Sequence, residues 1–307
     1  MASAELASPT SDISKIVYLG TPEIAVKPLQ ELVRAGFEVP LVITRKDARR
    51  GRGKQTSPNP VKLAAQDLGI RVSHDLADIT TADADIGVVV AYGRIIPVDI
   101  LRQIALVNLH FSLLPKWRGA APLERALIQG DVETGVCLMA IEEGLDTGGV
   151  YDVANLVIKS DWNLADLAAS CVEVGSDMLV KNLKVGLGEP KAQVGEPTYA
   201  SMLTSDEFEI TPDSSALEVV RKLKVRPCWM MVEGKRVKVW AAKVSDQGED
   251  LESGQLLGEL LGLSGGTLLL EQVQPEGKKP MSADVWTQGR QNKSGYLDLV
   301  GLSLIHI

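Results

Sequence analysis

Short apolar runs separated by helical stretches are the feature that most restricts the fold of this chain. The runs at 16–19, 39–44, 70–72 and 86–91 are rich in Val, Ile and Leu, and their lengths suit buried strands. The stretches at 22–36 and 60–68 between them have the apolar spacing and the end signals of helices. Strands that alternate with helices predict a mostly parallel sheet with helices on both faces. We therefore expect an α/β, Rossmann-like fold in this part of the chain.

The pattern changes between Gly186 and Ser205, where periodicity is lost and Gly and Pro accumulate as in an exposed linker. Beyond it, 214–224 reads as a helix, and the alternating segments 228–232, 237–241, 254–261 and 267–273 read as strands. Short strands separated by Gly predict a small β-barrel. We place the first domain at 12–187, the linker at 188–206 and the barrel domain at 207–307. A chain of 307 residues with 45% apolar content can supply two such cores.

Charge and cysteine content exclude several classes of protein. The net charge of −8 argues against a surface that is basic all over and binds nucleic acid without specificity, so any such contact must come from local patches. Three widely spaced cysteines without CxxC spacing predict neither a disulfide framework nor a zinc site, and a chain with three histidines is not expected to form a His-rich metal site. The first residues lack the apolar core of a signal peptide, and no run of about 18 apolar residues occurs. We expect a metal-free cytoplasmic protein that does not enter the membrane.

The residues with the clearest chemical potential lie around 107–111. Apolar residues alternate there with Asn108 and His110, which predicts a strand with both polar side chains on one face. An amide can donate a hydrogen bond to an oxygen that becomes negative, and an imidazole can exchange a proton near neutral pH. Asp146 lies in a loop after the apolar run 135–141, where it could orient the imidazole or relay its proton. Taken singly, each is more often a structural, capping or turn residue, but together they suit chemistry at an acyl carbon.

Taken as a set, these motifs resemble the formyltransferase family that uses 10-formyltetrahydrofolate, in which Asn, His and Asp form the catalytic trio. The resemblance places Asn108, His110 and Asp146 at the positions of that trio. The continuation KWRGAAP is similar to family members that act on methionyl-tRNA rather than on a glycinamide ribonucleotide. The stretches GTPEIAVKPL, GRGKQTSPNPVK and VVVAYGRIIP agree with it. The resemblance implies that a loop contacts folate, and this loop consists of Ser112, Leu113, Leu114 and Pro115. We add Tyr92 and Gly93 to the expected folate-binding residues, because they follow the end of a strand.

The resemblance also implies the reaction and its partners. The co-substrate would be 10-formyltetrahydrofolate, the acceptor would be initiator methionyl-tRNA, and the second domain would be an OB-like barrel; we expect a monomer. The amine of methionine is already a nucleophile. Asn108 and His110 would stabilise the negative oxygen, and Asp146 would accept or shuttle the proton. Phe111 stands where Gly is frequent in the family, which adds bulk beside His110.

Basic residues concentrate in two places. The stretch 45–54 holds six basic residues and one acid; a solvated loop is the alternative interpretation. In the family this loop inserts into the acceptor arm of tRNA, so the expected contacts are Arg50, Arg52 and Lys54. A second set of basic residues follows the linker, and phosphate contacts there would hold tRNA in register: Arg221, Lys222, Lys224, Arg226, Lys235, Arg236, Lys238 and Lys243. Trp229 and Trp240 lie among them and could stack on bases, but a Trp at strand spacing is more often a core residue, which is what we expect.

Three other functions compete with this interpretation. A sibling formyltransferase could act on an amino sugar nucleotide, since such enzymes share the trio, but the GRGK loop and the barrel favour tRNA. A non-catalytic module could bind tRNA or folate on the same scaffold, against which the intact trio argues. A nicotinamide-dependent oxidoreductase would need a GxGxxG turn, and GTPEIA after the first strand lacks that spacing.

Overall fold

The computed structural model describes residues 6–10, 12–49, 56–248, 250–290 and 294–298. The chain divides into two compact units, each built around its own sheet. The N-terminal unit comprises 1–123, 132–161 and 165–201, and the C-terminal unit comprises 124–131, 162–164 and 202–307. The limits of the linker, 188 and 206, stay a prediction.

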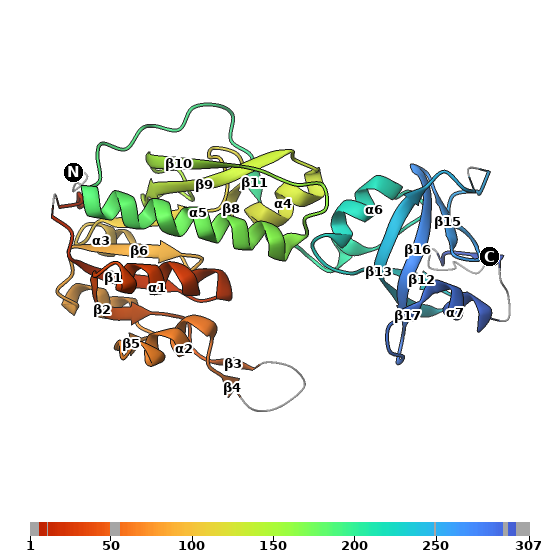
Figure 1. Ribbon diagram of the computed structural model, residues 1–307, viewed down its shortest axis with the longest axis horizontal. Coiled ribbons are helices and arrows are strands. Elements are labelled where there is room, and N and C mark those ends of the chain that lie inside the picture. Colours follow the sequence, from red (N-terminus) through yellow and green to blue (C-terminus); the bar gives the residue numbers. More distant parts are fainter. Residues whose placement is uncertain (1–5, 11, 50–55, 249, 291–293, 299–307) are drawn as a thin grey trace, which may run out of the picture. The chain divides into compact units, whose positions relative to one another are not determined.

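The N-terminal unit has a seven-stranded sheet in the order β10-β9-β7-β6-β1-β2-β5 (Figure 1). The strands β5, β2, β1, β6 and β7 are parallel, and β9 and β10 add an antiparallel edge. The predicted mostly parallel sheet is thus confirmed. The bounds are β1 Lys15–Gly20, β2 Glu38–Ile43, β5 Val72–Ser73, β6 Ile86–Val90, β7 Leu106–His110, β9 Glu133–Ala140 and β10 Val150–Val157.

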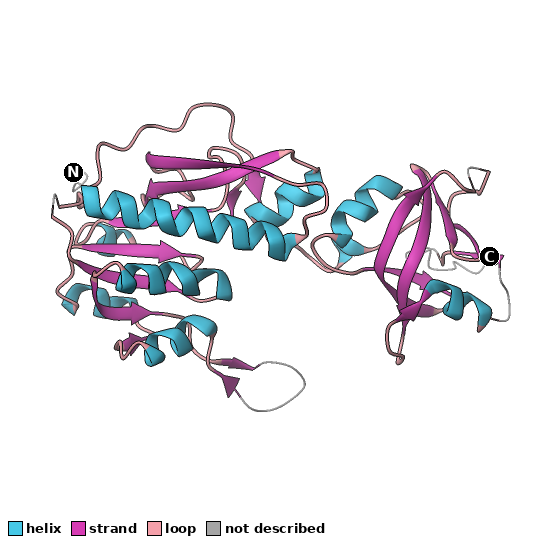
Figure 2. Cartoon of the chain, viewed as in Figure 1, coloured by secondary structure: helices cyan, strands magenta, loops and turns pink. Residues whose placement is uncertain are grey.

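Helices cover both faces of this sheet (Figure 2). On one face, Val17 and Leu19 of β1 share a buried cluster with residues of η2 (Leu76–Thr81) and α3 (Val98–Leu101). On the other face, the hydroxyl of Tyr18 donates to the carbonyl of Ala25, directly before α1 (Val26–Arg34). This alternation is the period of two of a buried strand. Other helices of this unit are η1 Glu23–Ala25, α2 Pro60–Asp67 and α5 Leu164–Val185, whereas most of α4 (Pro122–Gln129) is assigned to the C-terminal unit.

The C-terminal unit is a curled antiparallel sheet in the order β12-β13-β16-β15-β14-β18, with β17 paired to β16. The N–H of Asp298, just after β18, donates to the carbonyl of Met231 in β12, so the last strand returns to the first. This agrees with the expected OB-like barrel. The bounds are η3 Asp206–Phe208, α6 Ala216–Leu223, β12 Cys228–Val232, β13 Lys235–Ser245, β14 Gln255–Leu257, β15 Leu260–Leu263, β16 Gly266–Pro275, β17 Met281–Ser282, α7 Ala283–Gln288 and β18 Ser294–Tyr296.

One strand prediction in this unit was wrong. The segment 254–261 forms not one strand but β14 and β15, which pair with each other in a tight hairpin. The turn contains Gly258 with φ +57, a left-handed conformation that Gly adopts without a steric penalty. Leu residues on both sides of the turn gave the segment its continuous apolar pattern.

Candidate functional site

Asn108 and His110 lie on β7, near the carboxyl end of the parallel strands. The strand is hydrogen-bonded between β6 and β9, and in register Asn108 faces Val89 and Met139. Asn108 is half-buried, whereas His110, the last residue of β7, is only 5% exposed. Their separation by two residues puts both side chains on the same face of the sheet. The strand therefore presents an amide and an imidazole side by side.

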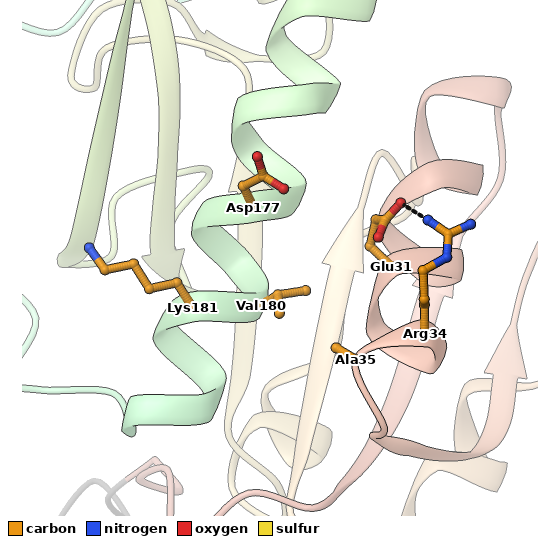
Figure 3. Close-up of a pocket in the computed structure, with 6 residues that line it drawn as sticks. All are labelled: Glu31, Arg34, Ala35, Asp177, Val180 and Lys181. Carbon is orange, nitrogen blue, oxygen red and sulfur yellow. Dashed lines mark hydrogen bonds and ion pairs between the residues drawn. The ribbon is translucent and has the colours of Figure 1, made fainter.

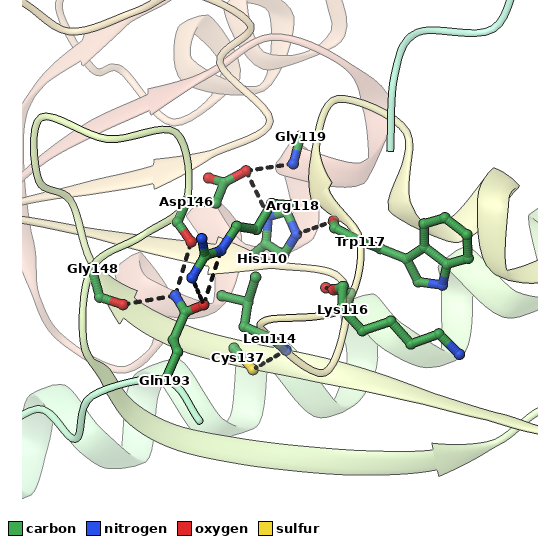
Figure 4. A network of polar contacts seen from close by, with 11 residues as sticks. His110, Leu114, Lys116, Trp117, Arg118, Gly119, Cys137, Asp146, Gly148 and Gln193 are labelled. Atoms are coloured by element: carbon green, nitrogen blue, oxygen red, sulfur yellow. Dashed lines mark hydrogen bonds and ion pairs between the residues drawn. The ribbon is translucent and has the colours of Figure 1, made fainter. Parts of the chain in front are cut away.

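Asp146 reaches this pair from the loop between β9 and β10. Its Oδ2 lies 3.6 Å from Nδ1 of His110 and accepts a 2.7 Å hydrogen bond from the backbone N–H of Gly119 (Figure 4). The residue has φ +52, in the left-handed region that a side chain other than Gly seldom adopts. The backbone of Asp146 is thus in a sterically constrained conformation, and its carboxylate faces the imidazole of His110. The two residues, 36 positions apart in sequence, meet at one point as expected.

The other ring nitrogen of His110 contacts the segment that follows the strand. Nε2 lies 2.9 Å from the backbone carbonyl oxygen of Trp117. A carbonyl can only accept, so Nε2 carries the proton of this bond. Burial lowers the pKa of His110 below its usual value, and the Asp146 carboxylate and the Trp117 carbonyl oppose that effect. A neutral imidazole protonated on Nε2 leaves the lone pair of Nδ1 directed toward Asp146.

The loop Ser112–Pro115 packs beneath these residues. The buried hydroxyl of Ser112 donates to the carbonyl of Lys116 at 2.5 Å, and the N–H of Leu114 donates to Sγ of Cys137 at 3.4 Å. Burial raises the pKa of Cys137 to about 11, so this thiol stays protonated at neutral pH. Leu113 lies against Gly135 of β9, where any Cβ would come within 2.4 Å of the Leu113 side chain. The loop is therefore fixed to β9 by both polar and apolar contacts.

Tyr92 and Gly93 follow the end of β6, one strand away from His110. Tyr92 is 2% exposed, and its carbonyl accepts a hydrogen bond from the hydroxyl of Thr21. The buried phenol oxygen of Tyr92 has no hydrogen-bond partner among the described residues. Burial raises the pKa of Tyr92, while Arg94 and Arg45 act in the opposite direction. Buried polar atoms are usually paired, and the side chain of Arg94 is the group that interacts with this hydroxyl.

The structure describes only part of the basic loop 45–54, which is expected to contact tRNA. Arg50, Arg52 and Lys54 lie outside the described residues. The strands on either side, β3 (Ala48–Arg49) and β4 (Thr56–Ser57), form a short antiparallel pair. The tRNA contacts of this loop remain a prediction.

Basic and aromatic side chains also gather on the C-terminal unit. The guanidinium of Arg236 lies 3.9 Å from the ring centre of Trp229, and that of Arg226 lies 3.9 Å from the ring centre of Phe208. Trp229 packs against the core of the unit as expected. The expectation for Trp240 was wrong, because this residue of β13 is 41% exposed, and it lines the same hollow as Lys238. A hollow is lined by Ser205, Phe208, Arg226, Pro227, Cys228, Trp229, Arg236, Lys238 and Trp240.

Sequence reasoning missed three groups of this site: the carbonyl of Trp117, the N–H of Gly119 and the side chain of Gln193. Two of the three are backbone groups, which no residue pattern reveals. Gln193 lies in a segment whose Pro and Gly content predicts an exposed linker. A separate hollow between α1 and α5, lined by Glu31, Arg34, Ala35, Asp177, Val180 and Lys181, contains none of the predicted site residues (Figure 3).

The structure also locates the cysteines and the possible metal ligands of the described residues. Within the described ranges, no three His, Cys, Asp or Glu residues are grouped as a metal site would require. Cys137, Cys171 and Cys228 are buried and unpaired with one another, and burial raises the pKa of the last two to about 12. No helix among the described residues is both long and apolar enough to span a bilayer.

Comparison with known proteins identifies relatives for both units. A family model described as formyl transferase matches residues 14–183, and a model of the formyl transferase C-terminal domain matches 202–291. The methionyl-tRNA formyltransferase of Corynebacterium diphtheriae is 36% identical over 92% of this chain and 98% of its own length.

Two solved structures share the fold at lower identity. The N-formyltransferase of Helicobacter canadensis, in complex with folinic acid and dTDP-3-aminofucose, has a TM-score of 0.63 at 19% identity and covers 84% of this chain and 98% of its own. HypX from Aquifex aeolicus, in complex with tetrahydrofolic acid, has a TM-score of 0.61 at 17% identity; the match covers 91% of this chain but 47% of HypX.

Proposed function

Because the chain belongs to the formyltransferase family, with methionyl-tRNA formyltransferases as relatives over 92% of its length, we propose that it formylates the methionyl group of initiator tRNA. The donor is 10-formyltetrahydrofolate, and the acceptor is the α-amine of the esterified methionine. The product is the formylated initiator tRNA that begins translation. The observation that carries the proposal is the approach of Asp146 to His110, two residues after Asn108 on the same face of β7.

The first requirement of this reaction is stabilisation of negative charge. Attack of the amine on the formyl carbon places that charge on the formyl oxygen. Asn108 is half-buried on β7 and can donate from its side-chain amide to an oxygen above the strand. A donor held in this way contributes roughly 3 kcal/mol to the transition state of acyl transfer. His110 can add a second donor only when Nε2 releases the carbonyl of Trp117.

The second requirement is removal of a proton from the attacking nitrogen. With Nε2 protonated, Nδ1 of His110 is the ring nitrogen that can gain a proton, and the Asp146 carboxylate 3.6 Å away stabilises the resulting cation. Asp146 can also accept the proton itself, directly or through water. A positioned base of this kind contributes on the order of 10²- to 10⁴-fold in rate. We assign the proton transfer to the pair His110 and Asp146.

We propose that the co-substrate binds at the carboxyl ends of β6 and β7. Folate carries polar groups on a flat ring, and Tyr92 and Gly93 follow shortly after β6 at this place. Gly93, with φ +75 and no side chain, allows close approach there. The loop Ser112–Pro115 supplies the opposite wall in this proposal. We propose no metal.

The tRNA is proposed to contact two basic surfaces. The first is the loop with Arg50, Arg52 and Lys54, and the second is the set of basic and aromatic side chains around Arg236 and Trp240. Cations on these surfaces can bind phosphates, and an exposed indole can stack on a base. We further propose that the protein acts as a monomer in the cytoplasm.

The proposal is tested by measuring transfer of labelled formyl from 10-formyltetrahydrofolate to three acceptors. These are methionyl-initiator tRNA, an amino sugar nucleotide and a glycinamide ribonucleotide. We expect label on the methionyl nitrogen, at a kcat/KM far above that for the other two acceptors. Preferential labelling of the amino sugar would assign the chain to the sibling activity. Binding of tRNA without transfer to any acceptor would make it a non-catalytic module.

A further inference from the structure

The side-chain amide of Gln193 belongs to the polar network around Asp146 and joins Arg118 to the Asp146 loop (Figure 4). Its Nε2 donates to the backbone carbonyl of Asp146 at 2.8 Å and to that of Gly148 at 2.9 Å. Its Oε1 accepts two hydrogen bonds from Arg118, from Nε at 3.1 Å and from Nη2 at 2.6 Å. Both the oxygen and the nitrogen of this amide are therefore hydrogen-bonded. They connect Arg118 to the loop that carries Asp146 and Gly148.

The orientation of the amide follows from its partners. The guanidinium of Arg118 can only donate, so the atom that faces it is the oxygen. The two carbonyls can only accept, so the atom that faces them is the NH₂ group. No other side chain of this length has one acceptor and two donors on a rigid plane. The network consequently requires glutamine at this position.

Gln193 belongs to a segment that is fixed to the N-terminal unit on both sides. Before it, Lys191 exchanges two backbone hydrogen bonds with Val150, the first residue of β10. After it, β11 (Tyr199–Ala200) pairs with β8 (Arg118–Gly119). The neighbouring side chain of Val194 is 88% exposed, whereas Gln193 is half-buried and directed inward. The segment thus delivers one specific side chain to the site.

The contacts form a closed circuit around His110. The three consecutive residues Trp117, Arg118 and Gly119 contact, in turn, the imidazole, the Gln193 amide and the Asp146 carboxylate. Gln193 closes the circuit by holding the backbone of the Asp146 loop. That backbone needs outside support, because a non-Gly residue at positive φ costs of order 1–3 kcal/mol unless its surroundings fix it.

We propose that Gln193 is a positioning residue, which fixes the loop carbonyls of Asp146 and Gly148 and so holds the Asp146 carboxylate against His110. It does not reach the reacting atoms and acts only through Asp146. This role rests on the function proposed above, in which Asp146 and His110 transfer the proton. The segment 191–200 accordingly contributes to the catalytic site of the N-terminal unit.

Two variants separate the contacts of Gln193. Gln193→Leu removes all four hydrogen bonds at similar volume. Gln193→Glu keeps the acceptor for Arg118 but replaces the two donors to the loop carbonyls. We expect both to lower kcat on the order of 10- to 100-fold, since small displacements of a catalytic group have effects of this size. KM for folate and for tRNA should stay within about twofold of the parent value, as expected for interactions realised mainly in the transition state.

A second readout does not depend on turnover. The chain has only three histidines, so the NMR titration of His110 can be followed with His74 and His306 as internal references. The Asp146 carboxylate raises the pKa of His110 against the effect of burial. If Gln193 holds that carboxylate in place, Gln193→Leu, which adds no charge of its own, shifts the His110 titration to lower pH. Val194→Ala, at the exposed neighbour, should change neither readout.

The proposal is overturned if kcat stays within about twofold of the parent in both variants. A loss of kcat with an unchanged His110 titration also overturns it, because Gln193 would then act by another route. Failure of the proposed function gives a different result, because the parent protein itself would then transfer no formyl group. The His110 titration would still show whether Gln193 holds Asp146 against His110. Circular dichroism at the assay temperature confirms that each variant is folded.

Discussion

The imidazole Nε2 of His110 is hydrogen-bonded to the backbone carbonyl of Trp117, seven residues further along the chain, at 2.9 Å. This bond assigns the proton of the neutral ring to Nε2 and leaves Nδ1 facing Asp146. The strand end and the loop that follows it therefore determine which nitrogen can receive a proton. The backbone geometry thus bears on the proton transfer proposed for His110 and Asp146, and the burial of the same ring bears on how protein stability depends on pH.

The first prediction concerns stability against pH. Burial holds the pKa of His110 below its ordinary value of about 6.5, so as pH falls the unfolded chain is protonated before the folded one. The free energy of unfolding should therefore decrease as pH falls below about 6.5, until the folded ring is protonated as well. Urea unfolding at pH 7.5 and 5.5 measures this for the parent and for His110→Gln. His74 and His306 are common to both, and an equal loss of stability in the two proteins would contradict the prediction.

The second prediction concerns the charge of Asp146. Asp146→Asn keeps the size of the side chain and an acceptor for the N–H of Gly119 but removes the negative charge near His110. We expect kcat to fall on the order of 10²- to 10⁴-fold, the usual contribution of a positioned base. Glu143→Gln, an exposed residue of the same loop, removes an equal charge and should be close to the parent. Similar rates for the two variants would exclude a specific role for the carboxylate.

The third prediction concerns Gly119, which has φ +117 and donates its N–H to Asp146. A Cβ there would lie 2.9 Å from the carbonyl oxygen of Ala200. Gly119→Ala should reduce the free energy of unfolding by about 1–3 kcal/mol and also lower kcat, because the N–H moves away from the carboxylate. Gly188→Ala, which meets nothing within 4 Å, is the control for thermal unfolding and turnover. Parent-like values for Gly119→Ala would show that this turn tolerates a side chain.

The fourth prediction concerns the basic loop. Arg52→Ala should raise KM for tRNA several-fold while KM for folate is unchanged, since phosphate contacts act on the nucleic acid alone. This increase in KM should become smaller at higher salt. The variant makes fewer phosphate contacts, so its tRNA binding weakens less steeply with salt than that of the parent. Lys184→Ala, at an exposed position of α5, removes an equal charge as a control. An equal loss of folate and tRNA use with Arg52→Ala would mean that the loop is structural.

Local sequence patterns predicted the elements that carry the site. Alternation around Asn108 and His110 predicted a strand, and β7 ends at His110, one residue earlier than the alternation suggested. Asp146 was expected in a loop after the apolar run 135–141; most of that run belongs to strand β9, and Asp146 lies in the loop that follows it. These predictions succeed because burial on one or two faces of a strand imposes a short-range pattern on the sequence.

Contacts between distant residues could not be predicted in the same way. The bonds from Gln193 to Arg118 and to the Asp146 loop join residues 75 and 47 positions apart, and neither leaves a periodic signal. Trp240 was misassigned because alternation alone does not tell which face of a barrel strand is covered. The helix α5 was not predicted at all, because small and apolar residues occur on most of its faces.

The most direct test of the account is the single-turnover rate of formyl transfer from 10-formyltetrahydrofolate to methionyl-initiator tRNA, measured for the parent and for folded Asn108→Ala, His110→Ala and Asp146→Ala. The account predicts that each variant loses on the order of 10²-fold or more while it still binds both substrates. A parent-like rate in any of the three would remove that residue from the mechanism and contradict the central claim.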